Sequence, residues 1–118
     1  MSGVRDLVYS VAKAELTQGE HAKEIGNIGQ TRVCVRRACG MAIEHWLQYN
    51  PNKNWGSSAI SMLTQLQKDD TIPKEIPDAA ERLTIKVGQN FETGIEDDPL
   101  KDGETIIEYY LDPKRLNK

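Results

Sequence analysis

The chain has few of the residues that bind metals or cross-link small domains. Its 118 residues include two cysteines, two histidines and one phenylalanine. Cys34 and Cys39 lie on one expected helix, where they point about 140° apart and are held too far from each other to form a disulfide. Neither has a second metal ligand one turn away. We therefore expect two small buried thiols, no metal site and no cofactor.

Long hydrophobic runs are also missing. No segment approaches the roughly 20 consecutive apolar residues that span a bilayer, and residues 1–9 lack the apolar stretch of a secretory signal. The sequence predicts a cytoplasmic protein that makes no membrane contact. A phosphate-binding loop is missing as well, because the two glycines in residues 26–29 lack the lysine and the spacing of that motif.

The alternation of apolar and polar residues that marks a half-buried strand does not occur in a convincing run. Internal repeats and low-complexity tracts are absent too. A chain of this length suits one core. Helical periodicity joined by mostly short connections predicts an all-α, antiparallel bundle of four to five helices. We expect residues 1–118 to form this single domain, with loose ends at 1–3 and 114–118.

The first helix is expected over residues 4–23. Its buried face is predicted from the helical spacing of four aliphatic side chains: Val4, Leu7, Val8 and Val11. Apolar residues thin out after Leu16, and Gly19 weakens the helix, so this end is expected to fray or to project from the bundle. Residues 26–29 are expected to form a loop, because two glycines within four positions interrupt a helix.

The second helix is expected over residues 31–49, with Thr31 as its N-cap. Its apolar face is wider than that of a surface helix, which predicts a central position. Two adjacent stripes make up this face: Cys34, Ala38, Met41, His45 and Tyr49, and Val35, Cys39, Ala42 and Trp46. Gly40 costs roughly 1 kcal/mol relative to alanine inside a helix. A close crossing with a neighbouring helix would account for it.

The third helix is expected to begin at Ser57 or Ser58 and to end near residue 68. Along this helix, Ile60, Leu63 and Gln67 are expected on one line, with Met62 and Leu66 beside it. The fourth is expected to start between Pro73 and Pro77 and to stop at Gly88. Its buried line is Ile76, Ala80, Leu83 and Val87.

An irregular acidic segment is expected over residues 91–97. The fifth helix should begin with Asp98 as N-cap and Pro99 just inside it, and Pro113 should end it. Its predicted buried side chains are Leu100, Gly103, Ile107 and Tyr110, flanked by Ile106 and Leu111.

Charge is distributed unevenly along a chain whose net charge is −3. This balance argues against a protein that coats nucleic acid. Arg32 and Arg36 share a helix face, and Arg37 lies about 100° further round. Such a row can bind phosphate in a bidentate manner. The other interpretation is that these arginines pair with carboxylates, for which Glu24, Glu44 and the acidic residues near the fifth helix are the candidates.

The histidines do not complete a catalytic set. His45 lies on the apolar stripe of the second helix, so it is either a core or interface histidine or a general acid–base or RNA contact. His21 lies on the exposed end of the first helix. No nucleophile with its base is found, so no catalytic residue is assigned. The binding candidates are Arg32, Arg36, Arg37 and His45.

The run from Arg32 to Glu44, RVCVRRACGMAIE, resembles the central helix of bacterial HEPN-type helical bundles. These carry an Arg-Val-Cys-Ala-Arg-Arg-Ala-Ala-Gly-like stretch. Residues 76–84, Phe91 and the Asp98-Pro99-Leu100 segment resemble the same bundles. The resemblance implies four or five helices, often a homodimer, commonly paired with a minimal nucleotidyltransferase in toxin–antitoxin or defence systems.

Many HEPN-type members are RNases, in which an arginine is followed four to six residues later by a histidine and the two meet across the dimer. In this chain seven residues separate Arg37 from His45. Catalytic roles are therefore not carried over from the resemblance.

Two functional hypotheses follow. In the first, the chain is a non-enzymatic helical-bundle module that self-associates and binds a protein partner such as a nucleotidyltransferase. In the second, it is a metal-independent endoribonuclease or RNA-binding protein, with Arg37 and His45 around a phosphate. A small-molecule site between helices is a third option, for which the sequence has no signature.

Overall fold

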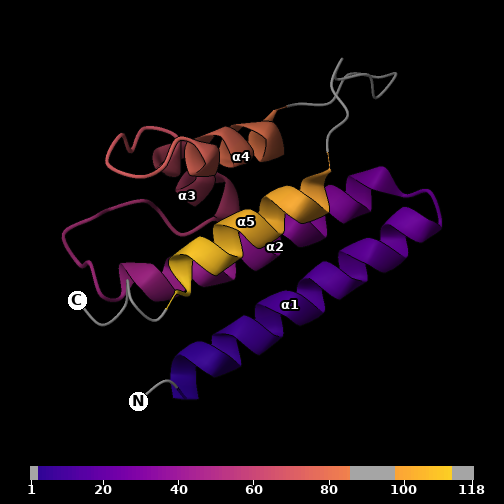
Figure 1. Ribbon diagram of the computed structural model, residues 1–118, viewed down its shortest axis with the longest axis horizontal. Helices are drawn as coiled ribbons and strands as arrows, with labels where there is room; N and C mark the ends of the chain where they lie inside the picture. The colour runs from indigo at the N-terminus through magenta and orange to yellow at the C-terminus, as the bar shows by residue number, and fades with distance from the viewer. Residues whose placement is uncertain (1–2, 86–97, 113–118) are drawn as a thin grey trace.

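The computed structural model describes residues 3–85 and 98–112 (Figure 1). This part of the chain contains no strand and five helices: α1 (Gly3–Glu24), α2 (Ile28–Leu47), α3 (Ala59–Leu66), α4 (Glu75–Thr84) and α5 (Pro99–Tyr110). Helix α2 contacts each of the other four. The predicted all-α bundle is confirmed, and α2 is its central element.

Helix α1 lies along one side of the α2–α5 pair, and α3 and α4 lie along the other (Figure 1). Residues 25–27 reverse the chain between α1 and α2, and Gly26 takes a positive φ of 80° there, a conformation that glycine adopts without steric cost. Helices α1 and α5 also run in opposite directions. Arg5 near the start of α1 donates to the carbonyl of Leu111 after α5, and Lys13 contacts Glu104 one helical turn into α5.

Helix α2 begins earlier than the sequence predicts. The last two residues of the predicted 26–29 loop are helical, and Asn27 is the N-cap in place of Thr31. The Asn27 side chain accepts a hydrogen bond from the backbone N–H of Gln30 at 3.0 Å. Thr31 is buried, with its hydroxyl 3.0 Å from the carbonyl oxygen of Gly19. The prediction was wrong because asparagine caps a helix at least as well as threonine, so the earlier cap prevails.

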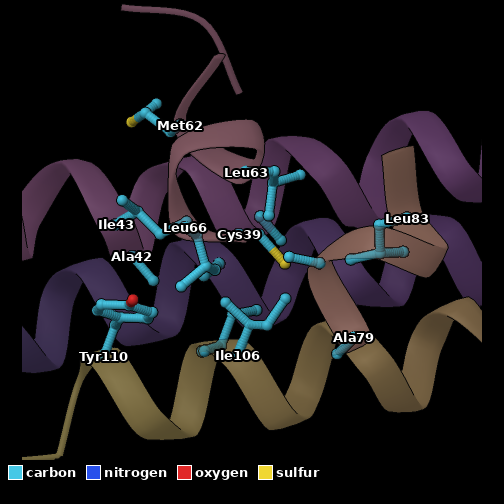
Figure 2. Close-up of a cluster of buried hydrophobic side chains, with 14 of the residues drawn as sticks. Cys39, Ala42, Ile43, Met62, Leu63, Leu66, Ala79, Leu83, Ile106 and Tyr110 are labelled. Carbon is cyan, nitrogen blue, oxygen red and sulfur yellow. The ribbon is translucent and has the colours of Figure 1, made fainter. Parts of the chain in front are cut away.

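The core is one cluster of side chains from all five helices (Figure 2). The aromatic ring of Tyr110 on α5 packs edge-on against Trp46 on α2, with centroids 5.0 Å apart. The two predicted stripes of α2 are buried, except that Met41 is half-buried and Tyr49 is exposed just beyond the helix end. The wide apolar face of α2 is therefore largely buried, as its composition predicts.

Gly40 and Gly103 lie at close contacts between helices. A Cβ atom added at Gly40 would lie 3.1 Å from the Cβ atom of Ala59 on α3. One added at Gly103 would lie 2.6 Å from Cγ1 of Val35, where α5 packs on α2. The close crossing that the sequence predicts at Gly40 is confirmed.

The inward face of α1 differs from the predicted one. Val4 and Leu7 are each 64% exposed and Val11 is 47% exposed. Val8, the fourth predicted residue, is half-buried and packs against the core. The buried positions are instead Ala12, Leu16, Gly19 and Ala22. This second row lies about 90° round the helix from the exposed row of Val4, Leu7 and Val11. Its small side chains let α1 come close to α2 and α5, so the second half of α1 is packed and does not project.

The shorter helices largely follow prediction. Ser58 caps α3, and its hydroxyl accepts a hydrogen bond from the N–H of Ser61 at 3.0 Å. Ile60, which was expected on the same line as Leu63, is exposed, because α3 turns Met62, Leu63 and Leu66 toward α2 and α4. The predicted buried positions of α4 that the structure describes are confirmed: Ile76, Ala80 and Leu83.

Helix α5 begins as predicted, with Asp98 as N-cap and Pro99 in its first turn. Its predicted buried residues are buried, apart from Leu100, which is half-buried. Helix α4 ends at Thr84, and Ile85 after it is extended, so the prediction that this helix continues to Gly88 was wrong. Other predicted features fall outside the described residues: Val87, the irregular segment 91–97, Pro113 and the tail 114–118.

Candidate functional site

Two of the three clustered arginines are directed at the C-terminal end of α4. Arg32 Nη2 donates to the carbonyl oxygens of Arg82 and Ile85 at 2.7 and 3.0 Å. Arg36 Nη1 donates to the carbonyl oxygen of Leu83 at 3.0 Å. The last carbonyls of a helix have no intrahelical partner and form the negative end of its dipole. The two guanidinium groups therefore stabilise the end of α4 and tie it to α2.

Arg37 points to the outer face of the bundle. Its Nε atom lies 3.1 Å from a carboxylate oxygen of Glu15 on α1, and 54% of its side chain is exposed. Pairing with a carboxylate was one of the two interpretations of this cluster, although the partner is none of the acidic residues named for it. Exposed pairs of this kind contribute about 1 kcal/mol or less. Among the three arginines, Arg37 is the one that a partner on this face can reach.

His45 is buried in α2 and does not meet Arg37, from which it lies roughly 12 Å away along the helix axis. Its ring packs edge-on against Tyr49, with centroids 5.3 Å apart. The buried Nε2 atom has no hydrogen-bond partner among the described residues. Burial first, and the nearby Arg5 guanidinium second, lower the pKa of the imidazole. His45 is therefore neutral near pH 7.

Cys34 and Cys39 form no disulfide, and both are buried. Burial, with a smaller effect of Asp102, raises the pKa of Cys39, so its nucleophilic thiolate form is disfavoured. The sulfur of Cys34 lies 3.6 Å from Gln30 Nε2 and 3.9 Å from Arg37 Nη2. Within residues 3–85 and 98–112, no group of three or more His, Cys, Asp and Glu residues could hold a metal ion.

An apolar row on the outside of α1 is the most distinctive surface of the described structure. We call its three exposed aliphatic side chains, Val4, Leu7 and Val11, the ridge. The alternating steps of three and four positions continue along the helix through Ala14, Gln18 and His21, and reach Ile25 directly after the helix ends. This is the heptad spacing with which one helix packs along another. Single exposed aliphatic residues are ordinary on protein surfaces, but three in one row form a patch.

The second half of the same face is hollow. A groove of about 490 Å³ lies between α1 and α2, and its lining is Glu15, Gln18, His21, Ala22, Ile25, Gln30, Cys34 and Arg37. Ala22 and Cys34 are buried, so the floor is made of small side chains. The Arg37–Glu15 pair forms part of its wall. Ridge and groove thus occupy the two halves of one helix face.

Comparison with known proteins gives no assignment. No family model matches the chain, and searches of curated proteins and of solved structures found no significant match. Among the described helices, none combines the length and the apolar character needed to cross a bilayer. The function therefore has to be inferred from the surface of the bundle.

Proposed function

We propose that this chain is a non-enzymatic interaction module that forms a homodimer through the outer face of α1. The observation that carries the proposal is the ridge, whose side chains are exposed although another face of α1, about 90° round the helix, is already packed against α2 and α5. Removing apolar surface from water is worth roughly 25 cal/mol per Å². Covering the ridge would therefore favour association.

A second copy of the chain matches this face in the spacing of its apolar row and in the area that it can cover. The ridge belongs to a row with heptad spacing, and a second α1 presents the same row. A helix of 22 residues is about 33 Å long. With α2 beside it the face is roughly 20 Å wide and presents on the order of 700 Å², close to the ~800 Å² that each partner contributes to a standard interface.

RNA fits the same face less well. The ridge is apolar, Arg32 and Arg36 are directed at the carbonyls of α4, and Arg37 pairs with Glu15. Affinity for nucleic acid comes mainly from several cations that neutralise phosphates, and the whole chain carries a net charge of −3. The endoribonuclease or RNA-binding interpretation therefore rests on the HEPN-type resemblance alone.

Two substitutions of matched exposure test the proposal. Val11 on the ridge and Ile60 on α3 are both 47% exposed, and only Val11 belongs to the α1 face. At high loading concentration, we expect the wild type and Ile60→Lys to approach the mass of a dimer in size-exclusion chromatography with light scattering. Val11→Lys should weaken the dimer at least ~30-fold, or about 2 kcal/mol, with unchanged helical content.

Equal dimer affinity for Val11→Lys and Ile60→Lys would contradict the assignment of this face. Salt-dependent RNA binding that is lost in Arg37→Met would support the RNA-binding alternative instead. A nucleotidyltransferase that binds the α1 face of a monomeric chain would replace the second copy as its occupant.

A further inference from the structure

The ridge and the groove define a surface that is complementary to itself. The ridge occupies the first half of α1, at positions 4, 7 and 11. The groove is lined in the second half by Gln18, His21 and Ile25. All six positions fall within an arc of about 100° round the helix. One helix face therefore carries a protruding half followed by a hollow half.

We infer that two copies pack with their α1 helices antiparallel, about a two-fold axis near positions 14 and 15, so that the ridge of each copy enters the groove of the other. This inference rests on the proposed self-association and adds the relative orientation of the two copies. In this register Val4 faces Ile25 of the second copy, and Val11 faces Gln18 of the second copy. The arrangement is isologous, so both ridge-and-groove contacts form at once.

The opposite orientation leaves the grooves unfilled. If the α1 helices were parallel, each ridge would meet the other ridge and each groove of about 490 Å³ would meet the other groove. Atoms that line an unfilled gap lose their dispersion contacts. In the antiparallel arrangement the three aliphatic side chains of the ridge fill a hollow whose floor is small and partly apolar.

Charge favours the same orientation. Residues 3–14 contain two cations and one anion, a net charge of +1, and residues 15–24 contain one cation and three anions, a net charge of −2. Antiparallel packing places each half of α1 beside the oppositely charged half of the other copy, whereas parallel packing places halves of like charge side by side. The helix dipoles are opposed as well, which is the more favourable alignment.

The residue at the inferred axis allows a close approach. Ala14 is exposed, falls within the same arc of α1 and has a short side chain. Helices pack at 8–10 Å between axes according to the size of the side chains at the contact, about 8 Å when these are small. A short separation at the centre would let the longer ridge side chains reach the groove floor at either end.

A spin label placed near the end of α1 measures the orientation. Glu24 is exposed and outside the groove lining, so Glu24→Cys can be labelled in the full-length chain. The antiparallel dimer places the two labels roughly 30 Å apart along the axis, at 1.5 Å per residue, whereas a parallel dimer places them at about 10 Å. The wild type is the control for labelling at the buried native thiols.

The outcomes separate this inference from the proposed function. A long distance supports the antiparallel arrangement. A short distance within a dimer overturns the arrangement and leaves self-association standing. A monomer at all concentrations overturns both.

Opposite charges at the ends of the face provide a second test. Val4→Glu and Ile25→Lys should each weaken self-association, by about tenfold or more. Mixed together, they should form a heterodimer of near wild-type affinity, because the antiparallel register places the glutamate of one copy beside the lysine of the other. A mixture that associates no better than either variant alone would overturn the register.

Discussion

Arg82 on α4 and Asp102 on α5 are joined by two parallel hydrogen bonds. Arg82 Nε and Nη2 donate to the two carboxylate oxygens at 3.0 and 2.9 Å, and Asp102 is buried. Paired bonds of this geometry are among the strong polar contacts of proteins. The helix before residues 86–97 is thereby fixed to the helix that follows them.

Removing the arginine of this pair should destabilise the fold. Arg82→Met leaves the Asp102 carboxylate buried without its cation, and we expect the free energy of unfolding to fall by about 2–3 kcal/mol. The measurement is urea denaturation. Lys74→Met is the control, because it breaks the exposed Lys74–Asp78 pair and should leave the transition midpoint unchanged. Equal shifts in the two variants would contradict the role assigned to Asp102.

The arginines directed at α4 should affect stability more than the exposed one does. Arg36→Met removes a charged donor from the last turn of α4 and should lower the free energy of unfolding by about 1–2 kcal/mol. Backbone amides of α4 should then exchange with deuterium faster. Arg37→Met breaks the exposed pair with Glu15 and a long contact with the Cys34 sulfur, and its effect should stay below about 1 kcal/mol. The reverse order would show that Arg36 does not cap α4.

Glycine at position 103 should be required for close packing. The Cβ atom of Gly103→Ala would collide with Val35 and crowd Leu16, so we expect a loss of about 1–3 kcal/mol. Gly29→Ala is the matched control, since its Cβ would meet only Asn27 Oδ1, at 3.8 Å. It should be neutral or should stabilise α2 by up to about 1 kcal/mol. A tolerated Gly103→Ala would show that α5 can move away from α2.

Burial of His45 should make the fold sensitive to acid. The pKa of His45 is lowered in the folded protein, so the unfolded chain binds the proton more readily. Stability is therefore unaffected above the ordinary histidine pKa of about 6.5 and falls as the pH drops below it, until the lowered folded pKa is passed. In His45→Phe this part of the pH dependence should disappear. Urea transitions of both proteins at pH 8, 6 and about 5 measure it, and identical slopes would contradict the prediction.

Local signals in the sequence predict the helices well. Ser58 and Asp98 are predicted and observed as N-caps, because capping depends on residues within one turn. The same reasoning misplaced the start of α2, where two good caps, Asn27 and Thr31, compete. Periodicity likewise identified α2 as central, since its apolar face is wider than a single contact requires.

The buried face of α1 could not be predicted from local signals or periodicity. Two rows on this helix have helical spacing, and the one with the larger side chains was expected inside. The structure buries the other row because small residues permit closer contact: a Cβ atom at Gly19 would lie only 3.3 Å from Leu100 Cδ2 and 3.4 Å from Cys34 Cβ. Which row packs against the neighbouring helices depends on the tertiary structure, so periodicity alone does not predict it.

The candidate site was predictable only in part. Spacing correctly placed Arg32 and Arg36 on one face of α2. Their observed partners are carbonyls near residues 82–85, about 50 positions further along the chain, and no local pattern indicates such contacts. The groove likewise depends on the packing of α1 against α2, and no sequence motif marks it.

Self-association through the outer face of α1 is tested most directly by the mass of the wild-type chain in solution. Sedimentation equilibrium from about 1 µM to 1 mM covers the affinities expected of a moderate to weak interface. We predict a reversible shift from the chain mass of 13.3 kDa to twice that value as concentration rises. A mass that stays at 13.3 kDa over the whole range would contradict the account.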